Sequence, residues 1–90
     1  MYIKELATQE KLVRRRKKRQ AAIDLLGNVC ADCKKSYPAP CYDFHHEDPS
    51  VKDEIVCNLV HQDRKLDVIL EEAQKCVLLC SNCHRMRHFQ

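Results

Sequence analysis

The sequence predicts a small α+β domain whose two ends are tied together, preceded by a basic helix. Three observations support this prediction. The chain has 90 residues, which is enough for one domain with a modest core. Two C-x-x-C pairs lie close to the two ends of the region 28–90, namely Cys30/Cys33 and Cys80/Cys83. Between the pairs, the residue pattern changes from that of a strand to that of a helix and back to a short apolar strand.

The segment 1–27 is expected to be a mostly helical arm. Residues 4–26 contain neither proline nor glycine, and strong helix formers dominate them. Residues 14–20 have no apolar position, so this part of the helix is expected to project into solvent or onto a partner. The end of the helix is marked by apolar residues at helical spacing and by the only glycine of the chain: Ala22, Leu25, Leu26 and Gly27.

Positive charge is concentrated in this arm. Residues 1–20 carry eight of the 16 Lys and Arg residues but only two of the 13 acidic residues, while the whole chain has a net charge of +3. A polyanion such as DNA is the natural partner of such a segment, and a solvated helix face is the alternative. The residues expected to grip a DNA backbone are Arg14, Arg15, Arg16, Lys17, Lys18 and Arg19.

The region 28–90 is expected to form one domain. Each C-x-x-C pair is expected to be a tight turn, and residues 50–60 stay ambiguous apart from an apolar end that is expected to face the core. The other elements, in chain order, are a strand over 41–46, a helix over 63–75 with Asp63 as its N-cap, a strand over 77–79 and a helix over 84–89.

The cysteine spacing indicates a metal site. The seven cysteines are odd in number and no segment reads as a secretory signal, so metal binding is favoured over disulfides. Two C-x-x-C turns supply the four thiolates of a tetrahedral zinc shell, which has no open position and is therefore expected to be structural. A redox pair is the alternative. The remaining cysteines are expected to be small buried side chains: Cys41, Cys57 and Cys76.

Four of the five histidines fall into two clusters. His84 and His88 are four positions apart, so they share one face of a helix and can bind one ion. His45 and His46 are adjacent and would point to opposite faces of a regular strand. The following Asp48-Pro49 pair is expected to end or bend the strand, so that both rings reach one site.

These clusters favour hydrolytic chemistry. An ion held by three imidazoles stabilises negative charge on a phosphate oxygen, and a fourth, free imidazole removes a proton from water. The alternative is that all four histidines hold a structural ion. His61 stands outside both clusters and is expected to be an ordinary surface or core residue.

The chain resembles the HNH endonuclease family, with its ββα-metal (His-Me finger) motif, and is most similar to the small zinc-containing members found in bacteriophages. Residues 43–49 and 78–85, with the first C-x-x-C upstream, carry the resemblance. It implies a ββα-metal domain stapled by zinc that hydrolyses DNA phosphodiester bonds and leaves a 5′ phosphate. It assigns His46 as the general base, and it assigns the ligands of a catalytic divalent ion as His45, His84 and His88.

One position departs from the family pattern. Lys75 stands where the family has an asparagine that pins the loop of the general base through backbone hydrogen bonds. Lysine can donate to a carbonyl but cannot accept, so it is expected to replace part of that role. Arg85 and Arg87 lie beside the expected metal site and are either phosphate contacts or solvent-exposed charges.

Two other functional classes remain open. One is a non-catalytic, zinc-stabilised nucleic-acid-binding module, which Lys75 favours. The other is an adaptor whose basic helix binds an acidic face of a phage or host protein. The histidine clusters favour the enzyme, since neither alternative needs them. The catalytic ion is Mg²⁺, Mn²⁺, Ni²⁺ or Zn²⁺, with imidazole ligands suiting the last two. No apolar run is long enough for a membrane span, and a cytoplasmic protein is expected.

Overall fold

The computed structural model describes residues 2–89. In them, four α-helices surround a two-stranded antiparallel sheet, which confirms the expected α+β class. None of these helices is both long and apolar enough to cross a membrane. Met1 and Gln90, the outer ends of the expected units 1–27 and 28–90, lie outside the described residues. The elements are α1 Tyr2–Leu25, β1 Tyr42–His46, α2 Val56–His61, α3 Leu66–Ala73, β2 Cys76–Cys80 and α4 Ser81–Phe89, with short 3₁₀ turns η1 Ala39–Cys41 and η2 Pro49–Val51.

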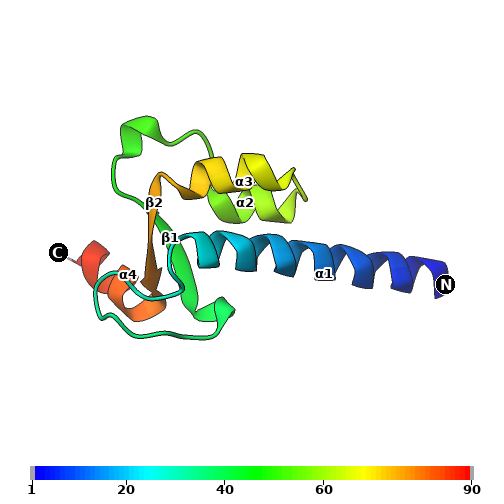
Figure 1. Ribbon diagram of the computed structural model, residues 1–90, viewed down its shortest axis with the longest axis horizontal. Helices are drawn as coiled ribbons and strands as arrows, with labels where there is room; N and C mark the ends of the chain where they lie inside the picture. The colour runs from blue at the N-terminus through cyan, green and yellow to red at the C-terminus, as the bar shows by residue number, and fades with distance from the viewer. Residues whose placement is uncertain (1, 90) are drawn as a thin grey trace.

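The sheet connects the group formed by α1, α2 and α3 to α4. Figure 1 shows α2 and α3 beside the C-terminal part of α1, while β2 leads away from them to α4. Tyr42 pairs with Cys80 at one end of the ladder and His46 pairs with Cys76 at the other. Because side chains alternate along a strand, Asp43 and His45 leave the face opposite to Tyr42 and His46. Each face of β1 therefore serves a different group of contacts.

The C-terminal turns of α1 belong to the core. Ala22 and Ile23 are fully buried, and Ile23 packs against Tyr42 and Leu78 of the sheet. Leu25, expected on the buried face, is 44% exposed instead. Ala22 and Leu26 of the expected face therefore pack on the core, while Ile23 takes the place of Leu25. Burial of this face joins the basic arm to the rest of the domain.

The composition of the basic part of α1 predicts that it projects into solvent, but several of its side chains contact the domain instead. Arg19 donates to the carbonyl of Tyr42 at 2.6 Å, and its guanidinium lies 5.4 Å from the centre of the Phe44 ring. Lys18 donates to Asp63 Oδ1 at 2.8 Å, and Arg14 donates to Asp63 Oδ2 at 3.1 Å. Three of the six basic residues thus bind the domain itself, while Arg15 is half-buried and Arg16 and Lys17 are exposed.

Asp63 is not the N-cap of α3. Lys65 occupies that position without a side-chain cap, and Asp63 sits two residues earlier in a left-handed backbone conformation, with φ of 54°. Asparagine and aspartate tolerate this conformation better than most residues. The Asp63 side chain therefore faces Lys18 and Arg14 and links the start of α3 to α1.

Replacing Asp63 by asparagine is expected to lower the thermal unfolding midpoint. Asparagine accepts the same φ, so the change removes mainly the carboxylate charge. Lys18 and Arg14 lower the pKa of Asp63. The stabilisation is therefore present above a pH of about 3.9, the ordinary value, and is lost as pH falls through the lower folded value.

Thermal unfolding at pH 7 checks this prediction, with Glu71→Gln as the control because Glu71 is an exposed carboxylate on α3. Asp63→Asn should melt below both the wild type and the control. The difference should shrink in about 1 M salt, because the three side chains are partly exposed to solvent. Equal midpoints would show that these ion pairs do not stabilise the docking of α1.

Candidate metal centres and the histidine pocket

The paired cysteines come together as the spacing predicts. Cys30 and Cys33 lie in the loop after α1, Cys80 ends β2, and Cys83 lies in the first turn of α4. Their four sulfur atoms all lie within 4.8 Å of one another, with Cys33 and Cys80 4.0 Å apart. Zinc–sulfur bonds of about 2.3 Å in a tetrahedron imply sulfur separations of about 3.8 Å. The arrangement therefore suits one tetrahedral ion.

Backbone geometry around the first pair is that of a tight turn. The N–H of Cys33 points at the sulfur of Cys30 at 3.5 Å, and Lys34 donates to the Cys30 carbonyl at 2.9 Å with a φ of 65°. The second pair differs from expectation, because Cys80 and Cys83 span the junction of β2 and α4 rather than a separate turn. The N–H of Cys83 still points at the Cys80 sulfur at 3.5 Å.

The surroundings of Cys30 and Cys33 favour the thiolates that bind a cation. Burial opposes ionisation of Cys30, but backbone N–H groups, led by that of Cys33, lower the pKa of Cys30 to about 6. A hydrogen bond from the Tyr37 hydroxyl lowers the pKa of Cys33. The pKa of Cys83 rises to about 12 because it shares a hydrogen bond with the Cys80 sulfur. Metal ligation requires thiolates, so the cluster is partly prepared for an ion.

The three other cysteines have unequal surroundings. Cys76 is buried, as expected, and its thiol donates to the Glu72 carbonyl at 3.7 Å. Cys41 is half-buried. Cys57 is exposed, so its expected role as a small buried side chain is wrong. It lies on the outer side of α2, where Arg19 reaches its sulfur at 3.4 Å.

Three histidines form a second candidate metal centre. His45 comes from β1, and His84 and His88 come from successive turns of α4. One ring nitrogen of each lies within 4.8 Å of the others, and the Nε2 atoms of His84 and His88 are 3.1 Å apart. Burial and the neighbouring His84 lower the pKa of His45, which favours the neutral, metal-binding imidazole. The expected triad is therefore assembled.

Asp43 supports this triad, although the sequence analysis did not single it out. Its carboxylate accepts a hydrogen bond from His84 Nδ1 at 3.1 Å. With the proton on Nδ1, the lone pair of His84 lies on Nε2, the nitrogen beside His88. The signal was present in the sequence, because Asp43 and His45 are two positions apart on a strand and so share a face.

His46 reaches the same pocket by a route different from the one expected. The strand ends at His46, as expected, but it does not bend before it, since His45 and His46 both hold regular ladder positions opposite Val77 and Cys76. The His46 ring leaves the other face and meets Glu72, with Nε2 2.7 Å from Oε2. A pocket of about 360 Å³ is nevertheless lined by all four histidines, and by Phe44, Pro49, Lys52 and Ile55.

The basic residues near this pocket fall into two groups. Arg87 is bound by Asp32 at 2.7 Å and by Glu47 at 3.1 Å, so its charge already has protein partners. Arg85 is exposed on α4. Lys52, which the sequence analysis missed, is exposed and lines the pocket itself. In the sequence, Lys52 is a single lysine shortly after the Asp48-Pro49 pair, and an isolated lysine is too common to indicate a site.

The position of Lys75 predicts a hydrogen bond to a loop carbonyl, but the lysine makes different contacts. Within residues 2–89, its ammonium group donates to two carboxylates, to Asp53 Oδ2 at 2.8 Å and to Glu72 Oε1 at 3.1 Å. The expected backbone contact is therefore wrong. Any influence of Lys75 on His46 must pass through Glu72.

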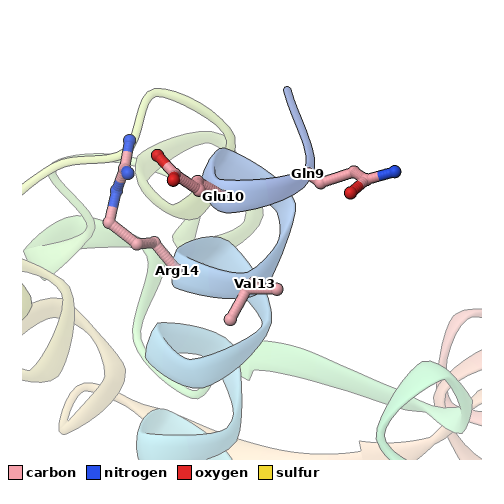
Figure 2. A pocket seen from close by; sticks show the side chains of 4 residues that line it. All are labelled: Gln9, Glu10, Val13 and Arg14. Atoms are coloured by element: carbon pink, nitrogen blue, oxygen red, sulfur yellow. The ribbon is translucent and has the colours of Figure 1, made fainter. Parts of the chain in front are cut away.

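Another pocket, of about 430 Å³, lies on the outer part of α1. Figure 2 shows its lining side chains, which are Gln9, Glu10, Val13 and Arg14. They include neither a nucleophile nor a group of metal ligands. The histidine pocket therefore remains the better candidate for chemistry.

Comparisons with known proteins add no further assignment. No protein-family model matches the chain, and the searches of curated proteins and of solved structures found no match. The geometry by itself defines a small α+β domain with a four-cysteine cluster and a histidine triad that suit metal binding.

Proposed function

We propose that this protein is a metal-dependent DNA endonuclease of the HNH type, with a ββα-metal site formed by β1, β2 and α4. The observation that carries the proposal is the assembly of His45, His84 and His88 around one point, with His46 at the edge of the same pocket. Three ligands leave coordination positions open, and a fourth histidine is available for proton transfer. A metal ion with open coordination positions and a general base are the two groups that hydrolysis of a phosphodiester requires.

Each side chain has a separate task in this proposal. The triad would hold a divalent ion, which when bound supplies positive charge to oxygens of the scissile phosphate. Asp43 keeps His84 in the tautomer that leaves Nε2 free for the ion. His46 takes a proton from water as the water oxygen attacks phosphorus. The bond from phosphorus to the 3′ oxygen breaks, and the departing oxygen takes a proton from solvent, leaving a 5′ phosphate and a 3′ hydroxyl.

The four-cysteine cluster would hold structural zinc. It joins the loop after α1 to the junction of β2 and α4, and His84 follows Cys83 directly. Zinc at this place would fix the first turn of α4 against the sheet, and with it the position of two triad histidines. Four thiolates leave no open position, which suits a structural role.

DNA contacts would come from basic side chains for which the described part of the chain shows no neutralising carboxylate. Lys52 lines the pocket, and Arg16, Lys17 and Arg85 are exposed. Such contacts neutralise phosphates and set affinity without reading sequence. Arg14, Lys18 and Arg19 would contribute less directly, since they already bind the domain.

Cleavage of supercoiled plasmid tests the proposed function. The full chain is incubated in EDTA and then with added Mg²⁺, Mn²⁺, Ni²⁺ or Zn²⁺, alongside His84→Ala and His61→Ala. We expect nicked or linear DNA with at least one ion for the wild type, and for His61→Ala, because His61 is exposed and outside the pocket. His84→Ala should lose the activity while keeping the zinc of the cysteine cluster.

Absence of cleavage with every ion would contradict the enzyme. Salt-sensitive DNA binding without cleavage would instead support the non-catalytic nucleic-acid module, for which the position of Lys75 is the specific argument. Binding to an acidic protein that survives nuclease treatment would support the adaptor.

A further inference from the structure

Glu72 is a buried carboxylate that the proposed function does not yet use. It is the one charged side chain in the described part of the chain that is nearly inaccessible to solvent. It lies at the end of α3, next to Ala73 of the apolar core. Burying a carboxylate is costly unless hydrogen bonds and opposite charge compensate it. Its partners therefore indicate what the position is for.

Both carboxylate oxygens of Glu72 are occupied. Oε2 accepts from His46 Nε2 at 2.7 Å and from the backbone N–H of Asp53 at 3.2 Å. Oε1 accepts from the Lys75 ammonium group at 3.1 Å. Lys75 also binds the Asp53 side chain at 2.8 Å, which closes a ring of contacts around Glu72. The carboxylate is therefore held from two sides and aimed at His46.

The contact with His46 is itself shielded from water. The side chains of His46 and Glu72 are only 8% and 6% exposed. Burial opposes ionisation of Glu72, but hydrogen bonds from His46 and Lys75 reverse this effect and lower the pKa of Glu72. An ionised carboxylate only accepts hydrogen bonds, so Nε2 of His46 must carry its proton toward Glu72. In the neutral ring, the lone pair is then on Nδ1.

We propose that Glu72 is a positioning residue that holds the His46 ring in the Nε2–H tautomer, and that Lys75 together with Asp53 holds Glu72 in turn. This inference rests on the proposed function, in which His46 accepts a proton from water. Glu72 does not touch the substrate. It fixes which nitrogen of His46 faces the reaction and prevents the ring from turning.

The same network gives Lys75 a role that its sequence position did not indicate. A lysine cannot reproduce both hydrogen bonds of an asparagine side chain. Here it acts on the carboxylate behind the histidine, while the N–H of Asp53 ties the loop after η2 to α3. The loop and the histidine are thus pinned through one shared group, Glu72.

Two readouts test the proposal on the full chain. The first is the tautomer of His46, read from long-range ¹H–¹⁵N correlations in the zinc-loaded protein. The second is single-turnover and steady-state cleavage by Glu72→Gln, with Glu71→Gln as the control because Glu71 is the neighbouring exposed carboxylate. We expect the Nε2–H tautomer in the wild type. Glu72→Gln should have a kcat lower by about tenfold or more, with unchanged KM for DNA and unchanged zinc content.

The double variant separates positioning from a general loss of structure. If Glu72 acts through His46, adding Glu72→Gln to His46→Ala should cause no further loss of activity. Full additivity, or a kcat for Glu72→Gln equal to that of Glu71→Gln, would overturn the inference. So would an Nδ1–H tautomer in the wild type. The tautomer decides the inference even if Glu72→Gln does not fold. It also decides it if no ion supports cleavage, an outcome that would remove the proposed function separately.

Discussion

Replacing Cys80 by serine is expected to unfold much of the domain. Cys80 is buried, ends β2 and contributes one of the four clustered sulfurs. Zinc binding supplies about 10–16 kcal/mol in small zinc-dependent domains, whereas a domain of this size has a total stability of about 5–15 kcal/mol. Losing one ligand should therefore remove most of the net stability.

Circular dichroism during thermal unfolding, with zinc content measured on the same samples, checks this expectation. Cys57→Ser is the matched control, because Cys57 is exposed and outside the cluster. It should keep the zinc content of the wild type and change stability by no more than about 0.5 kcal/mol. A strong chelator should reproduce the effect of Cys80→Ser on the wild type. A Cys80→Ser protein that melts like the wild type would refute the structural role of the ion.

Short-range sequence spacing predicted the parts of the site that a single element carries. The first C-x-x-C pair depends on one turn and the His84/His88 pair on one helix, while Cys80 and Cys83 lie three positions apart across the junction of β2 and α4, so the geometry of each pair follows from the local conformation. The strand containing His45 was likewise visible from its composition. These local patterns placed both candidate metal centres correctly.

The contacts that surround those centres could not be predicted in the same way. Glu72 looks like an ordinary charged residue of an amphipathic helix, and only the packing of α3 on the sheet brings it to His46, 26 positions away in the chain. Lys18 and Asp63 are 45 positions apart. Their pairing overrode two local expectations, a solvent-exposed basic helix and an N-cap aspartate. Tertiary partners of charged side chains are not encoded in periodicity.

Alanine at position 46 is expected to reduce cleavage by about 10²–10⁴-fold without loss of DNA binding. His46 is outside the triad, so the variant should retain both metal centres. The substitution also leaves Oε2 of Glu72 without its imidazole partner, which should cost about 1–3 kcal/mol of stability. Lower activity of the alanine variant alone would therefore have two explanations.

His46→Gln separates the two explanations, because its amide can still donate to Glu72 but cannot act as a base at neutral pH. We expect His46→Gln to recover stability relative to His46→Ala and to remain equally inactive. Thermal unfolding measures the stability of the two variants, and cleavage of a labelled duplex under single-turnover conditions, together with DNA binding at two salt concentrations, measures their activity. An active His46→Gln would show that proton removal belongs to another group or to solvent. Two inactive variants that bind DNA normally would identify His46 as the base, because the fold, the metal centres and DNA binding would all be intact without it.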